Sequence, residues 1–196
     1  MRETKTVTLP SEEEVSSERK RLEKQKSFRR TMRTTIYALI VVAAVAVLLA
    51  TLFFPVLRVS GTSMQPTLYD EDIILLVKFG NYETGNLVGF YYQNKLLLKR
   101  IIGGPGDVID IDDEGNVFVN SELLDEPYLS EKAFGESDLI YPYQVPEGRY
   151  FVMDDHRTTS IDSRSSAIGC IEKDQIVGEV AFCIWPLKHF QFLNGS

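Results

Sequence analysis

The sequence predicts a mainly β protein, in which one N-terminal transmembrane helix is followed by an all-β domain. The run 36–56 carries no charged residue and is apolar almost throughout, which is typical of a membrane-spanning helix. After residue 58 the apolar stretches are short, lie between turn residues and show no long helical period. The 196 residues accommodate one anchor and one domain of about 140 residues, which is enough to bury a hydrophobic core.

Residues 1–33 form a charged N-terminal segment, with 10 Lys and Arg against 6 Asp and Glu. The part from Ser16 to Thr31 is rich in charged residues and glutamine but has no apolar face. This part can form a solvated helix, but the expectation for 1–33 is a disordered cytoplasmic tail.

Residues 34–57 are expected to form the anchor. As a helix, the 21 uncharged residues 36–56 span roughly 31 Å, close to the thickness of a bilayer core. Three arginines within 29–33 precede the run and a single one, Arg58, follows it closely, so the positive-inside rule places the N-terminus in the cytoplasm. A cleaved secretory signal would have a shorter apolar region of about 7–15 residues ending in small residues, whereas this run ends in L-F-F-P.

Residues 58–196 are acidic, with 11 Lys and Arg against 22 Asp and Glu. Because nucleic-acid phosphates bind Lys and Arg, this balance argues against a nucleic-acid partner. The two cysteines, Cys170 and Cys183, are too few for a disulfide scaffold or a zinc site. They can form one disulfide if they lie on neighbouring strands, but two buried reduced thiols are the favoured expectation because free cysteine is usually buried.

Seven short stretches beyond the anchor have the composition of β-strands. The turn 112–115 joins the fourth and fifth of them as a hairpin. Residues 121–148 are polar and contain proline, and we expect an irregular insertion there within an extracytoplasmic domain over 58–196. The predicted strands are 72–78, 87–92, 95–102, 108–111, 116–120, 150–153 and 175–184.

The stretch S-G-T-S-M-Q-P-T-L at 60–68 comes a few residues after the anchor, so we expect it just outside the membrane. Ser63 stands between Gly61 and Pro66, on backbone that is neither regular helix nor central strand. Such a placement can present a hydroxyl at the mouth of a groove, which makes Ser63 a candidate nucleophile. Taken alone, a serine in such a stretch is ordinarily a turn residue.

Lys99 lies in L-L-L-K-R-I-I at 96–102, one of the most apolar runs of the domain. Along a strand Lys99 and Arg100 point to opposite faces, so one of them must face inward. Burial disfavours the charged form of a lysine, which suits a lysine to act as a general base near neutral pH. The alternative is a lysine on an edge strand whose side chain reaches water.

Two further stretches surround these candidates. G-G-P-G-D at 103–107 predicts a tight turn that ends the lysine strand, since neither G-K-[ST] nor a helix follows as in a phosphate loop. The loop 157–164 gathers hydroxyl, carboxylate and guanidinium groups, either as a solvated loop or as support for the site. In the second case Ser160 hydrogen-bonds the lysine amine, and Asp162 and Arg164 form a charge-assisted pair.

Three of these stretches together resemble the sequence boxes of bacterial type I signal peptidase, a membrane-anchored Ser–Lys protease. S-M-Q-P-T-L at 63–68 is similar to the nucleophile box S-M-x-P-T-L. K-R-I-I-G-G-P-G-D at 99–107 is similar to the lysine box, and S-I-D-S-R at 160–164 to the S-x-D-S-R box. Their order, the single preceding anchor and the closing V-G…W-P within 177–186 also fit, so the resemblance covers roughly residues 30–190.

The resemblance implies a catalytic β fold of the signal-peptidase type, which LexA-like self-cleaving repressors share. In it Ser63 attacks the scissile carbonyl, Lys99 accepts the serine proton, and the backbone N–H of Ser63 stabilises the oxyanion. A lysine at the base position is the bacterial form of the family. No cofactor or metal is implied. The residues expected to support the site are Ser160, Asp162, Arg164 and Asp155, and those expected to contact the substrate are Met64, Pro66 and Gly61.

The chain departs from the family pattern in two places. Gly61 stands where some members carry a hydroxyl that supplies a second oxyanion donor. The family usually has M-G-D-N-R where 153–157 reads M-D-D-H-R: Asp155 matches, but Asp154 replaces the glycine and His156 the asparagine. A glycine at this position could have been needed for a positive φ, so its loss raises the question of the local backbone path.

The implied function is removal of signal peptides from secreted preproteins, with cleavage after small residues in an A-x-A pattern. The implied partners are secretory preproteins and the lipid bilayer, and the implied location is the cell membrane with a single pass. Four alternatives stay open: a signal peptidase specialised for pilus or other restricted substrates, a membrane-anchored binding domain with a degenerate site, a LexA-like protease, and a Ser–His hydrolase using His156. The LexA-like reading is disfavoured because no DNA-binding segment is present.

Overall fold

The computed structural model describes residues 11–78, 80–158 and 161–193. The chain divides into two compact units, Met1–Leu49 and Ala50–Ser196. The domain boundaries expected at 33/34 and 57/58 stay predictions.

A single helix, α1 (Glu12–Phe53), begins well before the apolar run. The expectation of a disordered tail is therefore wrong for the residues from Glu12 onward. Glu, Lys, Arg and Gln have high helix propensity. They extend a helix that the apolar run already nucleates, so this segment can be helical without an apolar face of its own. The helix is long and apolar enough to cross a membrane, and it ends two residues before Pro55, where an X-Pro step disfavours helix.

The larger sheet has eight strands, all paired antiparallel. A short strand, β12 (Gln191–Phe192), pairs with β11 outside the main order. Three-residue 3₁₀ helices, η1 (Lys173–Gln175) and η2 (Leu187–His189), precede and follow β11. The main order is β1 (Val56–Arg58), β2 (Ile73–Val77), β11 (Ile176–Trp185), β3 (Leu87–Tyr92), β4 (Lys95–Gly103), β9 (Arg149–Met153) and β10 (Ile171–Glu172).

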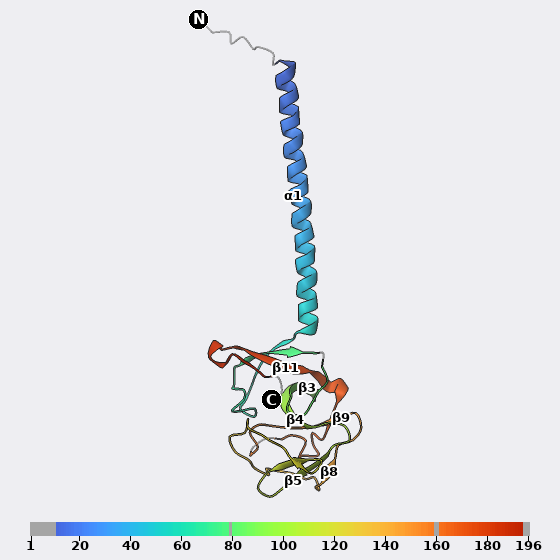
Figure 1. The fold of residues 1–196 in the computed structure, drawn as a ribbon, viewed down its shortest axis with the longest axis vertical. Coiled ribbons are helices and arrows are strands. Elements are labelled where there is room, and N and C mark those ends of the chain that lie inside the picture. Colours follow the sequence, from blue (N-terminus) through green and yellow to red (C-terminus); the bar gives the residue numbers. More distant parts are fainter. Residues whose placement is uncertain (1–10, 79, 159–160, 194–196) are drawn as a thin grey trace. The chain divides into compact units, whose positions relative to one another are not determined.

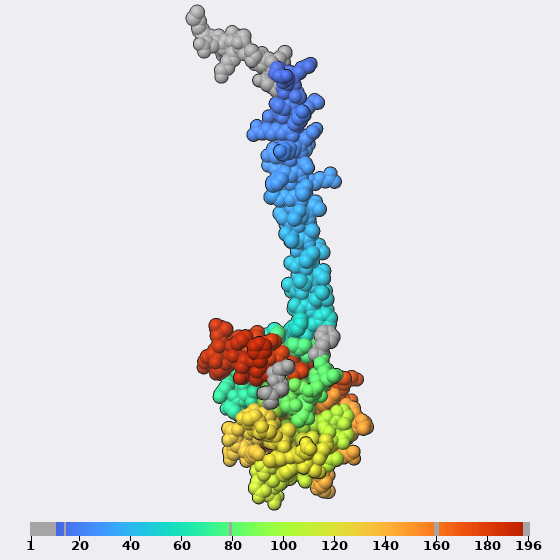
Figure 2. Space-filling model, viewed as in Figure 1, coloured from blue at the N-terminus to red at the C-terminus, as the bar shows by residue number. Residues whose placement is uncertain are grey.

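The smaller sheet has the order β7 (Glu122–Leu123), β6 (Val117–Val119), β5 (Val108–Ile111) and β8 (Tyr143–Gln144). The predicted hairpin is confirmed, because Ile111 pairs with Val117 across the turn 112–115. Strands β5 and β8 lie at the end of the domain away from β11 (Figure 1). The insertion 121–148 is irregular apart from the two-residue strands β7 and β8, and its yellow segment forms part of the visible surface in Figure 2.

The apolar residues of the domain form three buried clusters. One of them includes Met64 and Leu68 from the stretch 60–68, so that segment is held to the core although it is not a strand. Cys170 and Cys183 are both free and buried, which confirms the expectation of two separate thiols.

Strand β4 lies between β3 and β9 in the larger sheet, so it is not an edge strand. Its residues Lys99 and Arg100 point to opposite faces, and each is only 5% exposed. The alternative of an edge-strand lysine reaching water is therefore wrong. The strand ends at Gly103, where the predicted turn begins.

Candidate active site

Ser63 lies in the irregular segment between β1 and β2 and is partly buried. Its neighbour Met64 is 2% exposed and Leu68 is fully buried, so both anchor the segment in the core. The carbonyl oxygen of Ser63 accepts a hydrogen bond of 2.9 Å from the backbone N–H of His156. These contacts fix the position of the serine relative to the loop that follows β9.

Lys99 and Ser63 line the same cavity, which has a volume of about 140 Å³. The cavity walls come from three stretches, 57–61, 63–64 and 96–99. Four leucines, one valine and Met64 are the apolar residues of these walls, and Lys99 supplies a buried amine at one side. The structure thus brings the two predicted reactive side chains together around one small cavity with both polar and apolar walls.

The ammonium of Lys99 forms an ion pair with the fully buried carboxylate of Asp154 through Oδ2. Burial raises the pKa of Asp154 to about 6, and the negative charge of Asp162 adds to the rise. The Lys99 ammonium and a polar interaction with the Ser63 hydroxyl act in the opposite direction. Asp154 is not among the non-glycine residues with positive φ, so this position does not require a glycine.

Asp155, the next residue, faces the other side of β4. Its carboxylate accepts two hydrogen bonds from the guanidinium of Arg100 and one from the hydroxyl of Thr67. Arg100 also donates to the carbonyl of Gly85 at 2.7 Å and stacks on Tyr128, with 3.7 Å from the guanidinium carbon to the ring centroid. This network connects the nucleophile segment to the strand that carries Lys99.

Asp162 and Arg164 form the charge-assisted pair that the sequence predicts. The guanidinium donates to both carboxylate oxygens of Asp162, at 2.9 and 2.8 Å, and both side chains are buried. Asp162 also accepts a hydrogen bond of 3.1 Å from the backbone N–H of Asp154. The pair therefore supports the backbone of the residue that contacts Lys99.

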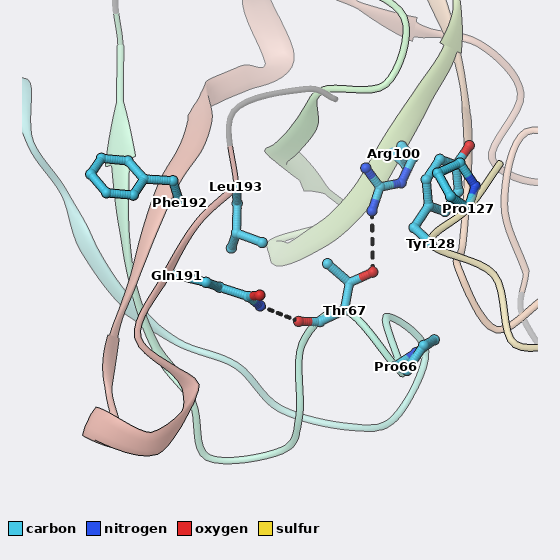
Figure 3. A pocket seen from close by; sticks show the side chains of 8 residues that line it. All are labelled: Pro66, Thr67, Arg100, Pro127, Tyr128, Gln191, Phe192 and Leu193. Atoms are coloured by element: carbon cyan, nitrogen blue, oxygen red, sulfur yellow. Dashed lines mark hydrogen bonds between the residues drawn. The ribbon is translucent and has the colours of Figure 1, made fainter. Parts of the chain in front are cut away.

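The remaining predicted residues do not all line the cavity that holds Ser63 and Lys99. Gly61 and Met64 line the cavity beside Ser63, and Gly61 has a φ of +97°. Pro66 instead lines a second cavity of about 380 Å³, where Thr67 accepts hydrogen bonds from Arg100 and from Gln191 (Figure 3). Ser160 lies outside the described residues.

Two charged contacts in this region were not expected from the sequence. The first is the ion pair of Asp154 with Lys99, since Asp154 was noted only as a replacement for glycine. The second is the fully buried pair between Arg157 and Glu126, a residue of the irregular insertion. Glu126 follows another acidic residue, Asp125, in a polar stretch, so its sequence neighbours give no sign that it pairs with a residue 31 positions away.

Comparisons with known proteins agree on one family. The family model for signal peptidase, peptidase S26, matches residues 32–185. The chain is 32% identical over 183 residues to signal peptidase I of Bacillus licheniformis, covering 86% of this chain and 97% of that protein. It is 36% identical over 154 residues to signal peptidase IB of Staphylococcus aureus strain MRSA252, covering 68% of this chain and 79% of the relative.

Among solved structures, a crystal structure of a signal peptidase I from Enterococcus faecalis V583 covers 51% of this chain and 97% of its own, with a TM-score of 0.45 and 24% identity. The family model matches well over half of the sequence, and the match includes both Ser63 and Lys99. The chain belongs to the signal peptidase family, peptidase S26.

Proposed function

We propose that this protein is a type I signal peptidase, a membrane-anchored serine endopeptidase that removes signal peptides from secretory preproteins. The observation that carries the proposal is the shared cavity of Ser63 and Lys99, which a buried amine and a serine side chain line together. A nucleophile beside a base at the edge of a cavity is the arrangement that acyl transfer requires. Membership of the family gives the reaction its substrate class.

In the proposed reaction Ser63 Oγ attacks the scissile carbonyl while the neutral amine of Lys99 accepts the hydroxyl proton. The backbone N–H of Ser63 makes no hydrogen bond to any residue that the structure describes, so it is available to stabilise the oxyanion. Gly61 offers no side-chain donor there. Lys99 then donates its proton to the leaving amine. In the second step Lys99 accepts a proton from water, which attacks the acyl group and releases it from Ser63.

The cavity beside Ser63 and Lys99 is the proposed binding site for the small residue that precedes the cleaved bond. It has a volume of about 140 Å³, and four leucines are among the residues that line it. Gly61, Met64 and Pro66 are proposed to contact the substrate near the cleaved bond, and Gly61 and Met64 lie in the cavity wall.

The location follows from α1 and its flanking charges. The arginines within 29–33 favour a cytoplasmic N-terminus, a single pass through the cell membrane and an extracytoplasmic domain. A domain attached directly to its anchor can reach peptide bonds near the outer membrane surface, where signal peptides end. The lipid bilayer is thus the second partner, and the acidic domain makes nucleic acid an unsuitable one.

The test is cleavage of a secretory precursor that ends in Ala-X-Ala by the full chain in detergent, with Ser63→Ala and Lys99→Ala measured alongside. We expect the wild type to cut after the last alanine and both variants to lose at least roughly a hundredfold in rate while remaining folded. The matched controls are Ser130→Ala and Lys95→Ala, which remove an exposed serine and the exposed lysine at the start of β4.

Other outcomes have definite meanings. Activity that survives Lys99→Ala assigns the base elsewhere, with His156 as the next candidate. If the wild type cleaves pilin-type precursors but not general ones, it is a specialised peptidase. Cleavage of neither set identifies a membrane-anchored binding domain instead.

A further inference from the structure

Asp154 is the one charged side chain that contacts Lys99 among the described residues. Its carboxylate is fully buried, its Oδ2 is bonded to the ammonium, and the Ser63 hydroxyl interacts with the same group. Ser63 and Lys99 thus line one cavity and Lys99 is paired with Asp154, although the three residues come from a turn, a central strand and the loop after β9.

The position of Asp154 is held by its backbone. Its N–H donates to Asp162 Oδ2 at 3.1 Å, and its carbonyl accepts a hydrogen bond of 3.0 Å from Arg157 Nε. The rest of the Arg157 guanidinium is paired with Glu126, so it does not neutralise the Asp154 carboxylate. Lys99 is the positive charge that faces this carboxylate, and Asp162 is the negative charge nearest to it.

The carboxylate is poorly stabilised as an ion. Burial and the charge of Asp162 raise the pKa of Asp154 to about 6 in spite of the adjacent ammonium. Its second oxygen, Oδ1, has no hydrogen-bond partner among the described residues, and a buried unsatisfied oxygen costs more when it is charged. A bound peptide that excludes water further favours moving the proton from the ammonium to the carboxylate, because an ion pair is costly to keep where water is excluded.

We propose that Asp154 accepts the proton that Lys99 must lose, so that Ser63, Lys99 and Asp154 act as one three-residue unit. This inference rests on the proposed function and deepens it. Asp154 acts on the substrate only through Lys99, so it is a positioning and proton-holding residue rather than a direct participant in bond cleavage.

The protons balance at every step. When substrate closes the cavity, Lys99–NH₃⁺ and Asp154–COO⁻ become Lys99–NH₂ and Asp154–COOH. The amine then accepts the Ser63 proton as Oγ bonds to the carbonyl carbon, and it passes that proton to the nitrogen of the leaving peptide. In deacylation the amine accepts a proton from water and returns it to Ser63 Oγ, and product release restores the original ion pair.

The experiment is the pH dependence of kcat/KM for precursor cleavage by the full chain in detergent. Asp154→Asn keeps the shape of the side chain and Asp154→Gly restores the residue usual in the family, so one variant remains informative if the other folds poorly. We expect the wild type to lose activity as the pH falls through about 6, because a protonated Asp154 cannot accept the lysine proton. In both variants this loss of activity near pH 6 should disappear from the pH profile, and kcat near pH 7.5 should fall roughly tenfold or more.

The control is Asp113→Asn, which makes the same charge change at an exposed turn and should reproduce the wild-type profile. The inference is overturned if both variants keep the wild-type acid limb and rate, or if either is faster than the wild type near neutral pH. A wild type that cleaves no precursor rejects the proposed function and this inference together. Cleavage that needs Ser63 and Lys99 but not Asp154 rejects the inference alone.

Discussion

The carboxylate of Asp155 accepts two hydrogen bonds from the guanidinium of Arg100, 2.8 Å from Nε and 2.7 Å from Nη2. Both side chains are buried, and the same carboxylate accepts a bond from Thr67. Arg100 and Lys99 are adjacent on β4, so this pair determines how the nucleophile segment sits against the strand that carries the proposed base.

Replacing Asp155 by Asn should destabilise the protein strongly, because it leaves a buried guanidinium without its counter-charge. We expect a loss of about 3–5 kcal/mol in the free energy of unfolding, measured by chemical denaturation in detergent. The matched control is Glu172→Gln, which breaks the exposed pair with Arg149 and should cost at most about 1 kcal/mol. Equal losses in the two variants would show that the buried pair contributes no more than an exposed one.

Enlarging the small cavity should relax the preference for small residues. Leu98 lines this cavity, and Leu98→Ala removes a branched side chain from its wall. We expect the ratio of kcat/KM for a precursor with valine to that for one with alanine before the cleaved bond to rise roughly tenfold. Leu123→Ala, at an exposed position in β7, serves as the control and should leave the ratio unchanged. An unaltered ratio in Leu98→Ala would place substrate selection outside this cavity.

Two glycines with positive φ should respond differently to alanine. A Cβ at Gly115 would lie 2.5 Å from the backbone carbon of Ala133, whereas a Cβ at Gly148 would meet nothing within 4 Å. Gly148→Ala should therefore cost only the left-handed backbone strain of about 1–2 kcal/mol, and Gly115→Ala clearly more. Thermal unfolding of both variants gives the comparison. Similar losses would mean that the insertion does not pack against the hairpin as described.

The stability of the protein should depend on pH through Asp154. Its pKa is raised from 3.8 to about 6 in the folded protein, so the folded state binds this proton more tightly than the unfolded chain does. The resulting stabilisation is fully present below about pH 4 and is lost as the pH rises through about 6.

Between about pH 4.5 and about pH 7 we expect the wild type to lose on the order of 2 kcal/mol more than Asp154→Asn does, measured by denaturant unfolding at each pH. Asp113→Asn, in an exposed turn, should follow the wild type. Parallel curves for the wild type and Asp154→Asn would contradict the raised pKa.

The orientation of the anchor should depend on the arginines that precede it. Replacing Arg29, Arg30 and Arg33 by glutamate removes the positive charges on the expected cytoplasmic side, while Arg58 stays on the other. We expect a substantial fraction of the chain to insert with its domain in the cytoplasm, measured by protease accessibility in intact spheroplasts. Replacing Arg19, Lys20 and Arg21 instead, farther from the apolar run, should change the orientation less.

The sequence by itself determined the order of the main elements and the family to which the chain belongs. The membrane helix, the hairpin 108–120 and the strand with Lys99 follow from local patterns of apolar and turn residues, which span only a few positions. Ser63 and Lys99 are predicted as the reactive pair because both lie in short stretches of unusual composition. The extent of α1 was underestimated because a charged helix that continues an apolar one leaves no periodic signal.

Only the tertiary structure decided which charged groups meet. Lys99 and Arg100 are buried on opposite faces of β4, an interior strand between β3 and β9, so each of them requires a partner inside the protein. Their partners are the adjacent residues Asp154 and Asp155, 55 positions away along the chain. A sequence states that a carboxylate exists but not which buried cation it faces, because that distance is set by the packing of strands far apart in the chain.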